Sequence, residues 1–142
     1  MVKQSILSVI YRGIEMGSLG IYYTKKGKFE IYDRYKIPHS KLHRLNGPAL
    51  IWNGGDKVWY KNGEIHREDG PAVIESNGDK EWWVNDKQHR LDGPAVTWKD
   101  GFKIWYINDK ELNKDEVENW IRNNNINLKT KKGQSLFMLK FG

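Results

Sequence analysis

Three histidine–arginine pairs recur along this chain at fixed spacing, and they are the residues best suited to chemistry. His43-Arg44, His66-Arg67 and His89-Arg90 each open an eight-residue stretch that runs through Gly-Pro-Ala, and successive stretches start 23 residues apart. An imidazole beside a guanidinium and a carboxylate could bind a metal ion, transfer a proton or hold a phosphate. Each possibility depends on how the fold places the three stretches relative to one another.

The equal spacing itself predicts the fold. A fixed period of this size is typical of proteins that stack one small supersecondary unit on copies of itself. In each copy two short apolar runs, such as Ala72–Ile74 and Glu81–Val84, flank Asn-Gly or Asp-Gly residues. Such residues tolerate positive φ and favour a hairpin. The sequence therefore predicts an all-β fold, an elongated, curved antiparallel meander of 23-residue β-hairpin repeats over residues 43–111.

The N-terminal flank, residues 1–42, is predicted to cap the repeats within a single domain of residues 1–142. Ser5–Tyr11 is rich in β-branched and aromatic residues, which favours a strand. Gly17 to His39 resembles a degraded copy of the unit. Terminal repeats are often atypical because they close the stack.

The C-terminal flank, residues 112–142, predicts one short helix and a closing strand. Asn113 is a suitable helix cap, with Glu116 three residues later, and the asparagines 123–125 are expected to end the helix. Val117, Trp120 and Ile121 form one apolar face at helical spacing. The tail Ser135–Phe141 is predicted to be a strand, with Ser5–Tyr11 as its candidate partner.

The spacing argues against a metal site shared by the three repeated histidines. Zinc ligands lie about 2.1 Å from the ion, whereas equivalent residues of successive two-strand units lie about 9–10 Å apart. Only His39 and His43, four residues apart, could approach each other. We expect no metal.

Catalysis finds no support in the motifs either. Asp69 and Asp92 resemble paired carboxylates, but Asn46 takes their place in the first copy, which indicates a role in the turn. The chain has no Gly-x-Ser-x-Gly, and its Lys131-Lys132-Gly133 run lacks the spacing of a phosphate-binding loop. The sequence therefore predicts a protein that is not an enzyme and has no cofactor.

Arg44, Arg67 and Arg90 form a row with two interpretations. The guanidiniums could bind phosphates and stacked bases beside aromatic rings. Alternatively each arginine pairs with an aspartate of its own or the next turn. Residues 43–111 hold ten Lys or Arg and twelve Asp or Glu, a balance of −2, which favours the pairing. Sequence-specific nucleic-acid binding is not expected, because no recognition helix or basic sheet is evident.

The aromatic residues are the other candidates for binding. They number 18 among 142 residues. Because side chains alternate along a strand, Trp59, Trp82 and Trp105 should share one face and Tyr60, Trp83 and Tyr106 the other. The predicted binding residues are Tyr60, Trp83 and Tyr106 or the pair Trp52 and Trp98, with Arg44, Arg67 and Arg90 at the rim.

The net charge of +6 resides in the two flanks. Residues 1–42 carry eight basic and three acidic side chains, and residues 112–142 carry six and three. The basic C-terminal end could attract phosphate groups or a membrane surface. No segment has the length and apolarity of a membrane span or the pattern of a signal peptide. We expect a soluble cytoplasmic protein.

The repeated motif resembles a known family. Trp59–His66 and its echoes at Trp82–His89 and Trp105–Glu111 resemble MORN repeats, in the variant of bacterial, phage and large-virus proteins that carries His-Arg-x-Asp-Gly-Pro-Ala. The resemblance covers residues 43–111. It implies a curved antiparallel sheet that serves as a scaffold for protein partners, or in some members for phospholipid, and it brings no catalytic residues.

The expected function is therefore a non-enzymatic protein-interaction module with an aromatic-rich sheet face. One alternative is a binder of a nucleotide or another small anion, which in a phage would act in counter-defence. A weaker alternative is association with an anionic membrane through the flanking lysines. Edge strands can pair end to end, so a homodimer is a further open alternative.

Overall fold

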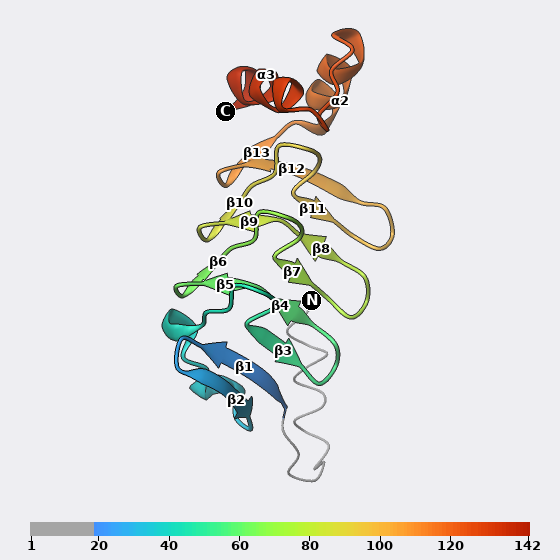
Figure 1. The fold of residues 1–142 in the computed structure, drawn as a ribbon. Helices are drawn as coiled ribbons and strands as arrows, with labels where there is room; N and C mark the ends of the chain where they lie inside the picture. The colour runs from blue at the N-terminus through green and yellow to red at the C-terminus, as the bar shows by residue number, and fades with distance from the viewer. Residues whose placement is uncertain (1–18) are drawn as a thin grey trace.

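The computed structural model describes residues 19–142, and these form an antiparallel β-sheet with two short helices at its C-terminal end (Figure 1). The hairpins lie one above another, with β1 and β2 at one end of the stack and α2 and α3 at the other. The strand predicted at Ser5–Tyr11 lies outside the described residues. The predominantly β, antiparallel architecture is confirmed.

Each 23-residue interval contains four short strands where two were predicted. The second strand of the first two intervals is interrupted at Trp59 and at Trp82, and after each tryptophan the chain forms a small two-stranded ribbon, β5–β6 or β9–β10. The third interval keeps one continuous strand at this place. The strands are β3 (Leu50–Trp52), β4 (Lys57–Val58), β5 (Tyr60–Lys61), β6 (Glu64–Ile65), β7 (Val73–Ile74), β8 (Lys80–Glu81), β9 (Trp83–Val84), β10 (Lys87–Gln88), β11 (Val96–Thr97), β12 (Lys103–Ile107) and β13 (Lys110–Leu112).

The main sheet has nine strands in the order β13-β12-β11-β8-β7-β4-β3-β1-β2. From β3 to β13 the order follows the chain, as a meander requires. The N-terminal hairpin, β1 (Gly20–Thr24) and β2 (Gly27–Ile31), joins the sheet through its first strand, because Ile21 pairs with Ile51 of β3. The later hairpins join the preceding one through their first strand and the following one through their second. The N-terminal hairpin therefore differs in its pairing from the units that follow, and the 3-10 helices η1 (Arg34–Lys36) and η2 (His39–Lys41) lie on the connection from β2 to β3.

Turn residues have the backbone conformations that their types favour. Asn62, Asn85 and Asn108 have φ near +50°, in the left-handed region that asparagine tolerates. Turn aspartates also link successive hairpins. The Asp86 carboxylate accepts the backbone N–H of Ile65 at 2.6 Å, and Asp109 accepts that of Gln88 at 2.7 Å. These bonds cross from one hairpin to the next and fix their register.

The helix predicted after Asn113 is confirmed. Helix α2 spans Lys114–Asn123, and the Asn113 side chain accepts the backbone N–H of Glu116 at 3.0 Å. Val117 is fully buried, and Trp120 and Ile121 pack beside it.

The closing strand predicted at Ser135–Phe141 is wrong. These residues belong to helix α3 (Lys131–Phe141), whose cap Thr130 accepts the backbone N–H of Gly133 at 3.0 Å. Gly133, Phe137 and Phe141, spaced four apart, are the buried residues of this helix. Helical periodicity of the bulky rings therefore outweighs the apolar, strand-like composition of the tail.

Apolar burial is concentrated at the two ends of the stack. The N-terminal cluster contains Ile31, Leu42, Ala49, Leu50 and Tyr60, and the C-terminal cluster contains Trp105, Ile107, Leu112, Val117, Leu128, Phe137 and Phe141. Between them the buried apolar residues are Ala72, Ala95 and Val96. The middle of the array therefore has little core of its own and depends on contacts between neighbouring hairpins.

Candidate functional site

The three arginines of the motif lie on aromatic rings. The guanidinium carbon of Arg67 lies 4.2 Å from the centre of the Trp59 ring, and that of Arg90 lies 3.7 Å from Trp82. Arg44 takes the same position over Tyr23 at 3.9 Å. Arginine–aromatic stacking of this kind stabilises a fold by about 1 kcal/mol or more when it is partly desolvated.

The same guanidiniums also hold the loops in which they lie. Arg44, Arg67 and Arg90 each donate from Nη1 to the proline carbonyl oxygen four residues later, at 3.0–3.1 Å. A Cβ placed on Gly70 would lie 3.0 Å from the Arg67 guanidinium carbon, so glycine lets this group pack against the backbone. The arginine of each motif is therefore a structural element of its loop.

Two of the arginines pair with the aspartate of their own turn, as one of the two interpretations predicted. Arg67 Nε donates to Asp69 at 2.8 Å, and Arg90 Nε donates to Asp92 at 2.6 Å. The hydrogen bond from Arg67 lowers the pKa of Asp69. Burial alone would raise the pKa of Asp92, but the hydrogen bonds from Arg90 and Lys129 outweigh it and the net shift is downward. Both carboxylates are therefore bound as anions.

The repeated histidines link neighbouring hairpins. His43, His66 and His89 each accept at Nδ1 the backbone N–H of the asparagine 19 residues later, at 2.9, 3.2 and 3.3 Å. Burial lowers the pKa of His89 and outweighs an opposing hydrogen bond from Asn108. An Nδ1 that accepts a hydrogen bond must be unprotonated, so these imidazoles are built into the fold in their neutral form.

None of the histidines in the described residues belongs to a metal-binding cluster. Over residues 19–142 no group of three His, Asp or Glu side chains could hold a metal ion. His39, which the sequence placed near His43, instead has its Nδ1 3.3 Å from the hydroxyl of Tyr60.

The rings predicted to bind a partner have different surroundings. Tyr60 is 7% exposed and belongs to the N-terminal core, and burial raises its pKa. Trp83 is half-buried and donates from Nε1 to Glu81 at 2.7 Å, whereas the Tyr106 hydroxyl donates to Glu111 at 3.1 Å. Tyr60 is therefore not a surface residue.

The tryptophans at 52 and 98 do not form a pair. Trp52 packs against the N-terminal cluster, and Trp98, at the end of the hairpin that follows β11, is 41% exposed and packs on Phe102 with 4.7 Å between ring centres. Neither tryptophan lies in the motif loops.

Two equivalent hollows lie between successive motif loops, and we call the surface that contains them the motif face. The first hollow, about 670 Å³, is lined by residues 44–47, Trp59, Lys61 and residues 66–69. The second, about 460 Å³, is lined by residues 67–70, Trp82, Val84, residues 89–92 and Gln134. Arg67, Glu68 and Asp69 line both, so the two hollows are adjacent parts of one surface.

The motif face contains rings that the sequence reasoning did not select as binding residues. Trp59 and Trp82 line the hollows, and the residues two positions further on, Lys61 and Val84, line them too, as strand alternation requires. The signal was present in the sequence, because each of these tryptophans precedes the stacked arginine by eight residues. Of the predicted residues, the hollows bring together Arg44, Arg67 and Arg90 only.

A third, smaller hollow carries basic charge. Lys25, Lys26, Lys41 and His43 line a space of about 360 Å³ beside Thr24, Ser40 and Asn62. No pKa or bonding feature distinguishes its lysines.

Comparison with known proteins gives no relative. No protein-family model, no curated protein and no solved structure matches the chain. The resemblance to MORN repeats therefore depends on the sequence motif alone. No helix of residues 19–142 has the length and apolar character needed to cross a membrane.

Proposed function

We propose that this chain is a non-enzymatic protein-interaction module of the MORN-repeat type, which binds a polypeptide partner on the motif face. The observation that carries the proposal is the pair of adjacent hollows lined by equivalent residues of successive motifs. A surface that offers the same shape twice, 23 residues apart, suits an extended partner better than a compact small molecule.

The residues that line the hollows support a protein partner. Trp59 and Trp82 provide rings, and tryptophan and arginine are common among residues that dominate binding energy at interfaces. Leu45 is 78% exposed at the mouth of the first hollow. Small-molecule sites usually enclose most of their ligand, whereas both hollows are open to solvent.

The contacts of the conserved-type polar groups within the motif argue against catalysis. The arginines are held by rings, carbonyls and aspartates, and the histidines accept backbone N–H groups. Groups engaged in this way are not available as nucleophiles or proton carriers.

A second candidate, the binding of a small anion, is favoured by the third hollow. Three lysines and His43 line it, and ammonium groups attract phosphates. A thermal-shift screen with nucleotides would then give an increase in Tm that grows with ligand concentration, and Lys25→Gln with Lys41→Gln would abolish the increase. Association with an anionic membrane remains the weaker third proposal.

Site-specific photocrosslinking in the cells that contain the protein tests the proposed module. A photoreactive amino acid replaces Leu45 on the motif face or, as a matched control, Leu139, which is 84% exposed on α3. We expect one discrete protein adduct from position 45 and none from position 139. Absence of an adduct at position 45, or equal adducts at both positions, would contradict the proposal.

A further inference from the structure

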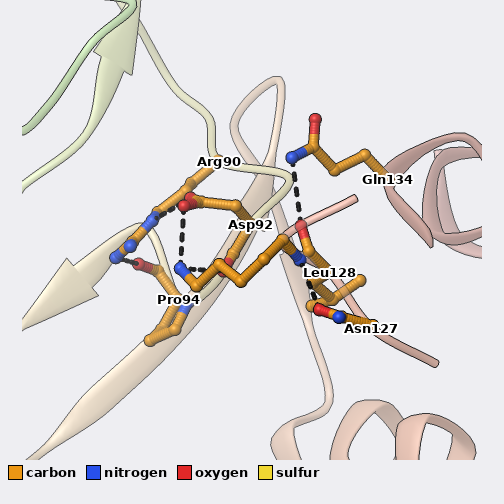
Figure 2. A network of polar contacts seen from close by, with 7 residues as sticks. Arg90, Asp92, Pro94, Asn127, Leu128 and Gln134 are labelled. Carbon is orange, nitrogen blue, oxygen red and sulfur yellow. Dashed lines mark hydrogen bonds and ion pairs between the residues drawn. The ribbon is translucent and has the colours of Figure 1, made fainter. Parts of the chain in front are cut away.

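The second hollow already holds part of this chain. Lys129 donates from Nζ to the Asp92 carboxylate at 2.9 Å and to the Asp92 backbone carbonyl at 3.1 Å. Figure 2 shows this segment against the motif, with Gln134 donating to the carbonyl of Leu128 at 3.0 Å. Gln134 also lines the hollow, and Leu91 packs against the C-terminal cluster, which includes Leu128. A segment with leucine next to lysine therefore binds one copy of the motif.

The first hollow has the same construction without such an occupant among the described residues. Its lining comes entirely from residues 44–69. Asp69, the equivalent of Asp92, is held by Arg67 through Oδ1, and its side chain is 84% exposed. Its other carboxylate oxygen corresponds to the one that Lys129 contacts on Asp92.

The rim of the first hollow differs from that of the second in a way that specifies charge. Glu68 stands where the second hollow has Leu91, and its side chain is 77% exposed. Across the hollow, Leu45 is exposed, whereas Leu91 of the third motif is half-buried against the C-terminal cluster. The first hollow thus combines two open carboxylates, one open leucine and the Trp59 ring.

We infer that the first hollow binds a basic segment of a protein partner, in which an apolar residue adjoins two or more lysines. The inference rests on the proposed function and specifies the chemistry of its partner. One lysine binds Asp69 as Lys129 binds Asp92, a second lies beside Glu68, and the apolar side chain covers Leu45. The chain's own Leu128-Lys129-Thr130-Lys131-Lys132 has this pattern.

A titration of the full-length ¹⁵N-labelled protein tests the inference. The probe is a peptide with the sequence of residues 126–134, Ile-Asn-Leu-Lys-Thr-Lys-Lys-Gly-Gln, and the control peptide has Ser for the leucine and Gln for each lysine. We expect NMR shift changes at the amides of residues 45, 68 and 69 and at the Trp59 indole with the probe only. The double variant Glu68→Gln, Asp69→Asn should weaken binding about tenfold, since each exposed ion pair contributes a few-fold, and Glu64→Gln, an exposed carboxylate of β6, should leave it unchanged.

Three results would overturn the inference. They are the absence of shift changes at millimolar probe, shift changes centred on residues 91 and 92, and equal binding by the double variant with its spectrum otherwise native. Sedimentation that shows self-association with the same shift pattern would assign the hollow to a second copy and would equally overturn it. If the peptide fails while the crosslink at position 45 persists, the interaction module stands and only the basic character of its partner is refuted.

Discussion

Replacing Arg67 by alanine separates a structural arginine from a ligand-binding one. The variant loses the stack on Trp59 at 4.2 Å and the hydrogen bond to the Pro71 carbonyl at 3.1 Å. A partly desolvated stack is worth about 1 kcal/mol, and a hydrogen bond from a charged donor about 1.5–2 kcal/mol. The ion pair with the exposed Asp69 is left out of the sum because solvent screens it. We therefore expect the free energy of unfolding to fall by about 2.5–3 kcal/mol.

Urea denaturation followed by circular dichroism measures this loss. In a chain of this size it corresponds to a decrease in Tm of about 5–10 °C. Arg67→Lys should recover little, because an ammonium group cannot stack and reach the Pro71 carbonyl as a planar guanidinium does. Lys57→Ala is the matched control, since Lys57 is exposed on β4, and it should change stability by less than about 0.5 kcal/mol. If Arg67→Ala is as stable as the wild type, the arginines are not structural and their role as ligand groups is restored.

Two further predictions concern the C-terminal core and the histidine ladder. Phe137→Ala should lower the free energy of unfolding by about 3–5 kcal/mol in the same assay, because Phe137 is fully buried and its ring centre lies 5.7 Å from that of Trp105, whereas Leu139→Ala on the exposed face should have little effect. The lowered pKa of His89 predicts that its contribution to stability is present above its unfolded pKa of about 6.5 and is lost as the pH falls through the lower folded pKa. Urea titrations at pH 7.5 and 5.5 and an NMR titration of the imidazole measure this, His89→Asn should reduce the pH dependence, and a folded pKa above 6.5 would show the reasoning to be wrong.

The sequence predicted those parts of the fold whose signals are local. Asn62 and its counterparts adopt the positive φ that their types suggest, and Asn113 caps α2. The tail Ser135–Phe141 misled because its run of apolar residues suits a strand. Its helical character appears only when Gly133, Phe137 and Phe141 are read as one buried face, and that face is defined by Trp105 and Trp120, which are distant in sequence.

The candidate site was less accessible to sequence reasoning. Alternation along a strand separated Trp59 from Tyr60 correctly, but it did not say which side would be buried. That choice depends on the N-terminal cluster, which covers Tyr60 and leaves Trp59 beside the motif loops. The pairing of Arg67 with Asp69 followed from charge balance, whereas its stack on Trp59 needed the three-dimensional return of the chain.

The end of the β array is written in two residues. Leu112 and Asn113 stand 23 residues after His89 and Arg90, at the positions of the next histidine and arginine. Leu112 is buried in the C-terminal cluster where a histidine would have accepted a bond from one more hairpin, and Asn113 starts a helix where an arginine would have covered Trp105. The Trp105 ring packs against Phe137 instead. His-Arg thus acts as a signal to continue and Leu-Asn as a stop, so a chain given a further 23-residue unit before Leu112 would gain one more hollow and keep its own terminator.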